Sequence, residues 1–326
     1  MTNAIPVDSF DVPVVLFVFN RVLETKALVE SLRAIRPTKI YVVADSPRSD
    51  VAGEEQVCAE VLKTFNTIDW DAEVSFNIAT RNLGCRDRIV SGIDWVFTVE
   101  ESAIFLEDDC IPNASFFYFM RSMLKRHSNT QEIGMISGNN YGFYSGIKLT
   151  RTYLSKFPHI WGWGTWKRSW DLFDKNLEKW SHSDQRSVVA WATKNPLAIG
   201  HWVNRFNKAV KDDSVWDAQW VCTLWMHRLY SLCPPQNLVT NIGFSSAATH
   251  TSQASIYQEW PTATIDAQEL EEAPWRTWSH DFIDTMIIRL ESLLGLIAKF
   301  RALKKFSNNL VALFKRRRDN FYEITD

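Results

Sequence analysis

The sequence predicts an α/β protein built on a mostly parallel β-sheet with helices on both faces. Three observations predict this class. Strand-like and helix-like segments alternate over the first ~100 residues, which is the order of βαβ units. The strand-like runs are almost continuously apolar, as in strands buried on both faces. The composition, with 46% hydrophobic and 23% charged residues, excludes collagen-like, coiled-coil and wholly disordered chains.

The expected elements follow from local patterns, taken in chain order. Runs that are apolar or alternate like strands predict β-strands at 13–20, 39–45, 72–79 and 102–109. Apolar residues at helical spacing predict intervening helices at 25–35, 53–66 and 87–97. The first helix is expected to end before Pro37, since proline cannot continue it. Ligands of parallel sheets bind beyond the carboxyl ends of the strands, so a site is expected there.

The second half of the chain has a different character. Of the 15 tryptophans, ten lie between Trp161 and Trp225. Helices are expected at 187–211 and 214–230, and a short strand at 237–244. No Gly-rich phosphate loop of the dinucleotide-binding or Walker A type is present, and no internal repeat. We therefore expect a Rossmann-like half at 1–136, a second half of the same domain at 137–260, and a tail at 261–326.

The tail combines basic and apolar residues. Between residues 292 and 318 there are eight Lys or Arg residues and no acid, and apolar residues interleave at roughly helical spacing. A basic amphipathic helix of this kind suits an anionic lipid surface, which would make the protein peripheral to a membrane. The alternative is a helix that packs back on the domain with its basic face in solvent.

Charge and cysteine content exclude other classes. The formal net charge of −2 argues against a nucleic-acid binder that relies on a basic surface. Five scattered cysteines without a CxxC pair predict a reduced, intracellular setting rather than a disulfide scaffold. The first residues have neither the basic nor the apolar part of a secretion signal, so a cytoplasmic location is expected.

An acidic triplet is the strongest chemical signal. In IFLEDDC the apolar run 104–106 leads directly to Glu107, Asp108 and Asp109. Three adjacent carboxylates are costly unless a cation neutralises them. A hard divalent ion, Mg²⁺ or Mn²⁺, held by one or two carboxylates and by a substrate diphosphate, would do so. The alternative is a solvated acidic turn. Asp45, at another strand end, favours the metal–diphosphate site.

Several short motifs lie at these strand ends in a fixed order. They are FNR at 19–21, VVADSPR at 42–48, NLGC at 82–85 and FLEDDCIPNASFFYF at 105–119. Together they resemble nucleotide-sugar glycosyltransferases of the GT-A fold. More narrowly, the chain is similar to bacterial polysaccharide glycosyltransferases that carry the label "hemolytic protein HlpA-like". At a greater distance it is similar to the inverting N-acetylglucosaminyltransferases that initiate complex N-glycans. The resemblance extends over about residues 12–255.

The resemblance implies roles for the residues of these motifs. The triplet takes the place of the DxD motif, with Asp109 as metal ligand, Asp108 against the ribose or a metal-bound water, and Glu107 facing the donor sugar. Asp45 then binds the nucleoside, and Arg21 reaches the nucleotide or diphosphate.

Two further positions near the donor keep alternatives. Arg86 and Arg88 either neutralise phosphate or are ordinary surface bases of a helix. Asn82 either caps that helix or touches the base.

A second motif, VWDAQW at 215–220, points to a general base. An inverting transferase needs a base to take the proton of the attacking hydroxyl. A carboxylate among indoles should be desolvated, which raises its pKa toward a useful range. Asp217, after Trp216, matches the place of the catalytic Asp in the distant relatives. The alternatives are Asp212 or Asp213 as base, and Asp217 as a helix cap.

An aromatic loop and a late histidine complete the expected site. In FPHIWGWGTWKRSW at 157–170, Gly162 allows close backbone approach, and Trp161 and Trp163 offer flat faces to sugars. With Trp216 these residues are expected to bind the acceptor, although buried Trp is more often core. His250, in ATHT, matches a C-terminal His that relatives use as a further metal or diphosphate ligand.

The residues and the resemblance together predict a metal-dependent, inverting glycosyltransferase of the Leloir type. The resemblance implies a UDP-sugar donor, with UDP-GlcNAc as one candidate, and an acceptor that is a glycan or lipid-linked saccharide of surface polysaccharide synthesis. One alternative is a sugar-nucleotide pyrophosphorylase, although FNRVLETK lacks its Gly-rich loop. The other is a non-enzymatic carbohydrate- or membrane-binding, hemolysin-like protein, which would not need the acidic triplet.

Overall fold

The computed structural model describes residues 10–140, 151–212, 214–243 and 262–265. The strands are β1 (Val14–Val18), β2 (Lys39–Ala44), β3 (Glu73–Ile78), β4 (Ser102–Glu107), β5 (Cys110–Pro112), β6 (Ile133–Ser137), β7 (Tyr153–Ser155), β8 (Trp163–Trp166), β9 (Tyr230–Cys233) and β10 (Val239–Asn241). The helices are α1 (Val22–Leu32), α2 (Glu54–Lys63), α3 (Gly84–Val96), α4 (Ala114–Arg126), α5 (Lys167–Trp170), α6 (Glu178–Ser181), α7 (Gln185–Ala192), α8 (Pro196–Ala209) and α9 (Asp217–Met226), with the 3₁₀ turn η1 (Thr64–Thr67) after α2.

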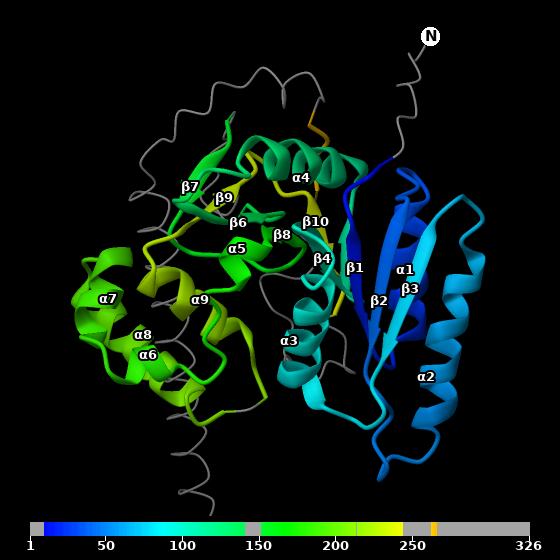
Figure 1. Cartoon of the computed structure of the whole chain (residues 1–326), viewed down its shortest axis with the longest axis horizontal. Helices are drawn as coiled ribbons and strands as arrows, with labels where there is room; N and C mark the ends of the chain where they lie inside the picture. Colours follow the sequence, from blue (N-terminus) through cyan, green and yellow to red (C-terminus); the bar gives the residue numbers. More distant parts are fainter. Residues whose placement is uncertain (1–9, 141–150, 213, 244–261, 266–326) are drawn as a thin grey trace, which may run out of the picture.

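One large mixed sheet forms the framework (Figure 1), and its order among the described strands is β3-β2-β1-β4-β8-β6-β9-β7. Neighbours from β3 to β4 are parallel, and so are β6 and β9. β8 runs against both of its neighbours, β4 and β6, and β7 runs against β9. The predicted α/β class with a mostly parallel sheet is confirmed.

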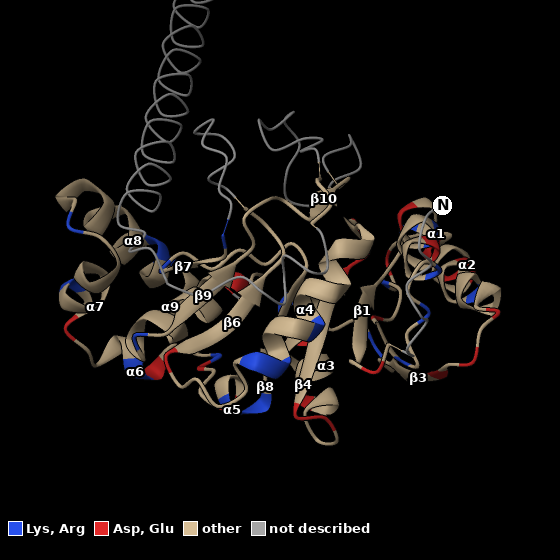
Figure 2. Cartoon of the chain, turned by 90° about the horizontal axis from the view of Figure 1, so that it is seen from above, with Lys and Arg blue, Asp and Glu red and all other residues tan. Residues whose placement is uncertain are grey.

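The sheet is covered on both faces because its strand residues alternate between two cores. Val14 and Leu16 of β1 pack into a cluster with α1, α2 and α4, whereas Val15 and Phe17 pack into a cluster with α3, β8 and α9. A third apolar cluster joins α6, α7, α8 and α9, and Figure 1 shows α6, α7 and α8 together at the end of the molecule opposite β1–β3. In Figure 2 most charged residues lie on helices and loops around a largely uncharged sheet.

Several predicted boundaries are wrong. The helix expected at 187–211 is two helices, because Asn195 caps α8 and Pro196 occupies its first turn, where proline is tolerated. The helix expected at 214–230 ends at Met226, and Tyr230 begins β9. The strand expected at 237–244 is only Val239–Asn241 and pairs with β5 outside the large sheet. Helix α4 was not predicted, although Asn113 caps its first turn.

Two expected features fall outside the described residues: the basic amphipathic helix of the tail and the loop that contains His250. None of the helices in the described part of the chain has the length and hydropathy that spanning a bilayer requires.

Candidate functional site

Parallel strands bring polar side chains together at one edge of the sheet. Arg21 follows β1, Asp45 follows β2, and Glu107 ends β4 just before Asp108 and Asp109. Because β1 pairs in parallel with both β2 and β4, the carboxyl ends of these strands are neighbours. We call these five residues the strand-end rim.

Arg21 forms the central ion pairs of the rim. Its Nη1 lies 3.0 Å from Oδ1 of Asp108 and 2.7 Å from Oδ2 of Asp109. All three side chains are at most a quarter exposed. Burial acts to lower the pKa of Arg21, but the charges of the two aspartates outweigh it and raise the pKa. Arg21 is therefore a fixed positive charge at this edge.

The acidic triplet carries more negative charge than Arg21 neutralises. Burial raises the pKa of Glu107 to about 8, and the charges of Asp109 and Asp108 add to the effect. Burial also raises the pKa of Asp108 to about 7, against the opposing influence of Arg21. Both shifts mean that the ionised forms lack sufficient positive charge nearby.

A divalent cation fits this surplus of oxygen ligands and negative charge. Among the described residues, no three His, Cys, Asp or Glu side chains already form a ligand set. One or two carboxylates of the rim, together with substrate oxygens, could hold such a cation. That division of ligands is usual for Mg²⁺ with phosphate substrates.

Asp45 organises the start of α3. One of its oxygens accepts the backbone N–H groups of Ser46 and Leu83, each at 2.9 Å, and the other accepts that of Gly84, also at 2.9 Å. Asn82 donates to the carbonyl of Ser46 at 2.7 Å. Asn82 is therefore not the helix cap, because Asp45 satisfies the free N–H groups from a neighbouring strand. Both oxygens of Asp45 are used in this way.

The charges of the rim and of Asp217 both act on Cys85. Its side chain is exposed, yet its pKa is raised to about 12. The causes are desolvation by the surrounding protein, followed by the charges of Glu107, Asp217 and Asp45. Asp217 also contributes to the raised pKa of Glu107. The structure therefore brings Asp217 within electrostatic range of the rim.

The surroundings of Asp217 differ from the expectation of desolvation among indoles. Asp217 is the first residue of α9, after Trp216, and its side chain is 33% exposed. Oδ2 lies 3.0 Å from Nη2 of Arg205, so the neighbour of this carboxylate is a cation as well as indoles. The helix has no side-chain cap, so Asp217 does not act as one. Of the rival aspartates, Asp212 binds Ser214 through Oδ1, and position 213 lies outside the described residues.

The aromatic residues of the second half are mostly core. Trp163 is 2% exposed and Trp216 is 3% exposed, and the two rings stack with centroids 5.6 Å apart. Trp163 also stacks on Phe105 of β4 at 4.7 Å. Burial leaves neither indole a face for an acceptor sugar. Trp161 is partly exposed and remains the position in this loop that could contact one.

The neighbouring glycine has a structural reason to be there. Gly162 has a positive φ of 66°, and a Cβ at this position would lie 2.8 Å from Val239 and 3.1 Å from Phe116. Its small size is therefore required by packing and by the left-handed backbone.

The two arginines of α3 separate in role. Arg88 is buried and donates to the backbone and side-chain oxygens of Asn77, each at 2.7 Å, so it is a structural residue. Arg86 pairs with Asp87 at 2.9 Å and reaches the carbonyl of Asp212 at 3.4 Å. Arg86 therefore connects the start of α3 to the segment that precedes α9.

Two further residues near the rim, Asn241 and Glu54, were not predicted from the sequence. Asn241 at the end of β10 donates to Oδ1 of Asp109 at 3.4 Å, and Glu54 binds Asn20 and Arg48 beside β1. Neither residue lies in a motif. The apolar pattern around β10 indicated a strand there. No pattern in the sequence indicated that this strand pairs with the three-residue β5.

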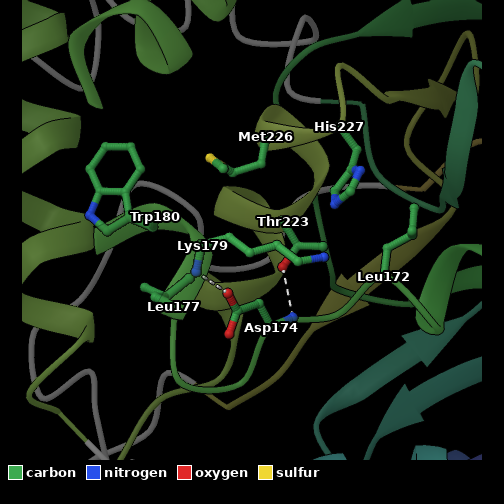
Figure 3. Close-up of a pocket in the computed structure, with 8 residues that line it drawn as sticks. All are labelled: Leu172, Asp174, Leu177, Lys179, Trp180, Thr223, Met226 and His227. Carbon is green, nitrogen blue, oxygen red and sulfur yellow. Dashed lines mark hydrogen bonds between the residues drawn. The ribbon is translucent and has the colours of Figure 1, made fainter. Parts of the chain in front are cut away.

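A small cavity lies beside α9, and none of the rim residues lines it (Figure 3). It is lined by Leu172, Asp174, Leu177, Lys179, Trp180, Thr223, Met226 and His227. Its volume of about 10 Å³ leaves room for roughly one water. The N–H of Asp174 donates to the hydroxyl of Thr223 at 3.2 Å, which fixes one wall. This space is too small for a substrate and belongs to the packing of the α6–α9 cluster.

Comparison with known proteins gives distant structural likenesses. No family model and no curated protein matches the chain. The mannosyltransferase PcManGT from Pyrobaculum calidifontis, in complex with GDP-Man and Mn²⁺, shares 11% identity over 66% of this chain and 69% of its own, with a TM-score of 0.35. The apo structure of the bifunctional glycosyltransferase WbbM shares 11% identity over 68% of this chain and 38% of its own, with a TM-score of 0.30. Both of these proteins are glycosyltransferases.

Proposed function

We propose that the protein is a metal-dependent, inverting glycosyltransferase of the GT-A type, which moves a sugar from a nucleoside-diphosphate sugar to a saccharide acceptor. The observation that carries this proposal is the strand-end rim, in which three carboxylates and Arg21 meet at one sheet edge within electrostatic range of Asp217. Residues 1–136 would bind the donor and residues 137–260 the acceptor.

The rim residues suit a nucleotide diphosphate. Asp109 is the proposed metal ligand, His250 is a second proposed ligand, and the bound cation would offset the charge that develops on the leaving diphosphate. Arg21 supplies a permanent positive charge beside Asp108 and Asp109, within reach of the same phosphates. By orienting the start of α3, Asp45 fixes Asn82 and Cys85 at the edge of this space.

Asp217 is the proposed base. Its carboxylate would accept the proton of the acceptor hydroxyl while that oxygen forms a bond to the anomeric carbon. The bond from this carbon to the diphosphate breaks on the opposite face, and the diphosphate leaves with the electron pair. One such displacement converts an α-linked donor into a β-linked product. Arg205 would orient the base through the contact at 3.0 Å.

The donor and acceptor follow from the family resemblance of the motifs. A UDP-sugar is the proposed donor, and UDP-GlcNAc is one candidate. A lipid-linked or growing surface polysaccharide is the proposed acceptor, and the basic residues between 292 and 318 would keep the enzyme at the membrane that carries it.

Donor hydrolysis tests this function without knowledge of the acceptor. The purified full chain is incubated with a panel of UDP- and GDP-sugars and Mn²⁺, and released nucleoside diphosphate is measured with and without EDTA. We expect one donor to give release of nucleoside diphosphate, and EDTA to abolish that release. The substitution Asp109→Ala should reduce the rate at least 100-fold, whereas the control Asp69→Asn, at an exposed residue, should leave it unchanged. No release from any donor would favour a binding protein, and pyrophosphate-dependent conversion of the UDP-sugar to UTP and sugar 1-phosphate would favour a pyrophosphorylase.

A further inference from the structure

A small two-stranded sheet, formed by β5 and β10, begins next to Asp109. β5 begins at Cys110, directly after Asp109, and pairs antiparallel with β10, with Cys110 opposite Asn241. Beyond this pair, the N–H of Ile242 donates to the carbonyl of Asp109 at 2.8 Å. The ladder therefore places Gly243 against the side chain of Asp109.

The space beside Asp109 admits only a glycine. A Cβ at position 243 would lie 2.1 Å from Oδ2 of Asp109, 2.8 Å from its Cγ and 3.0 Å from its Cβ. Gly243 is not among the glycines with positive φ, so space rather than backbone conformation requires it. Because the whole carboxylate lies this close, rotation of its oxygens alone would not relieve the overlap.

Both oxygens of the Asp109 carboxylate have polar partners. Oδ2 of Asp109 lies 2.7 Å from Nη1 of Arg21, and Oδ1 is 3.4 Å from the amide of Asn241. The amide oxygen of Asn241 in turn accepts the N–H of Gly243 at 2.8 Å. The thiol of Cys110 also donates to Oδ1 of Asp109, at 3.5 Å. Arg21 and Asn241 thus contact the carboxylate through polar groups, and the missing side chain at 243 leaves room for it.

We propose that Gly243, together with Asn241, is a positioning residue that holds the Asp109 carboxylate in the orientation in which it binds the divalent cation. This inference rests on the proposed function, since it assumes that Asp109 is a metal ligand. Residues that orient a ligand without touching the metal commonly change metal affinity by about 10–100-fold.

The test compares Mn²⁺ binding by matched glycine variants. Mn²⁺ is titrated into the full chain, with and without UDP, and the free Mn²⁺ is measured by electron paramagnetic resonance. The titration is done for the wild type, Gly243→Ala and Gly200→Ala. Gly200 lies in α8, where an added Cβ would meet no atom within 4 Å, so its substitution adds the same methyl group at a tolerant place. We expect Gly243→Ala to weaken Mn²⁺ binding at least tenfold and Gly200→Ala to leave it unchanged.

Two more variants separate the possible failures. Asn241→Ala creates no overlap and should weaken binding in the same direction, which keeps the test valid if Gly243→Ala does not fold. If Asp109→Asn weakens Mn²⁺ binding but Gly243→Ala and Asn241→Ala bind as the wild type does, the positioning role is overturned and the metal site stands. If Asp109→Asn also binds Mn²⁺ as the wild type does, the metal assignment itself fails.

Discussion

Arg21 and Asp109 meet at the ends of two neighbouring parallel strands, with Nη1 2.7 Å from Oδ2. The pair joins β1 to β4 at the point where their backbone hydrogen bonds end. Arg21 also reaches Asp108, so one guanidinium holds two adjacent carboxylates. It therefore contributes to the stability of the fold as well as to the charge of the site.

Removal of Arg21 should destabilise the protein. Arg21→Ala leaves two largely buried carboxylates without their cation, and we expect a loss of about 3 kcal/mol in the free energy of unfolding at neutral pH. Arg21→Lys keeps a positive charge and should lose less. Urea denaturation measures both, with Arg33→Ala, at an exposed ion pair, as the control with the smaller effect. Equal losses for Arg21→Ala and Arg33→Ala would contradict the prediction.

Asp45 should matter for the start of α3 before any ligand is bound. Asp45→Ala removes the acceptor of the N–H groups of Leu83 and Gly84, and we expect a loss of about 1–3 kcal/mol in the free energy of unfolding. Hydrogen exchange of these two amides should accelerate in the variant. Asp50→Ala, in the exposed loop that follows, serves as the control. Unchanged exchange at both amides would show that Asp45 does not hold this helix end.

The lowered pKa of Glu54 should make the stability of the fold sensitive to acid. Hydrogen bonds from Arg48 are the largest cause that lowers the pKa of Glu54 from 4.5 to about 2. A carboxylate whose pKa is lower in the folded state stabilises the fold above its unfolded pKa, and this contribution disappears as the pH falls toward 2. Glu54→Gln should therefore cost about 1–3 kcal/mol at pH 7, and its difference from the wild type should shrink between pH 4.5 and 2.

A pH series of unfolding curves checks this expectation. Glu55→Gln is the matched control, because Glu55 is the next residue of the same helix and is exposed. A difference between wild type and Glu54→Gln that stays constant down to about pH 2 would mean that Glu54 has an ordinary pKa in the folded protein.

Cys85 offers a chemical reporter of the proposed site. Of the five cysteines, it alone is exposed, and its pKa is raised to about 12. Because the thiolate is the reactive form, alkylation by iodoacetamide at about pH 8 should be more than tenfold slower than that of a free thiol and should rise with pH. UDP with Mn²⁺ should slow it further by covering the site.

Mass spectrometry of the labelled peptide gives the rates for Cys85. Denatured protein, in which all five thiols react, supplies the reference for complete labelling. Labelling at the rate of a free thiol, with no effect of UDP and Mn²⁺, would place Cys85 outside the charged surroundings described for it.

The framework of the donor side could be predicted from sequence because its information is local. The runs at β1, β2 and β4 are continuously apolar and end in polar residues, so both the strands and the edge that carries Arg21 and Asp109 follow from pattern alone. The pairing of β5 with β10 could not be predicted. It joins residues 131 positions apart through only three residue pairs, as in the match of Cys110 with Asn241.

The tryptophans show the other limit of the sequence. Trp161 and Trp163 differ by two positions, which in a strand places them on the same face, and the motif gives them the same meaning. The two residues differ only in how they pack. Trp163 is the first residue of β8 and stacks on Phe105 and on Trp216. Trp161 precedes the strand and is partly exposed. The surroundings of Asp217 could not be predicted either, because Arg205, its ion-pair partner, lies in a different helix.

Strand β8 has a consequence for protein engineering. It belongs to the second half of the chain, yet it lies between β4 and β6, with Trp163 in register with Phe105 only two residues before Glu107. A chimaera assembled from residues 1–136 of one homologue and the remainder of another would have to rebuild this ladder from unmatched parts. Recombination should therefore succeed only when crossover points keep β4 and β8 from the same parent.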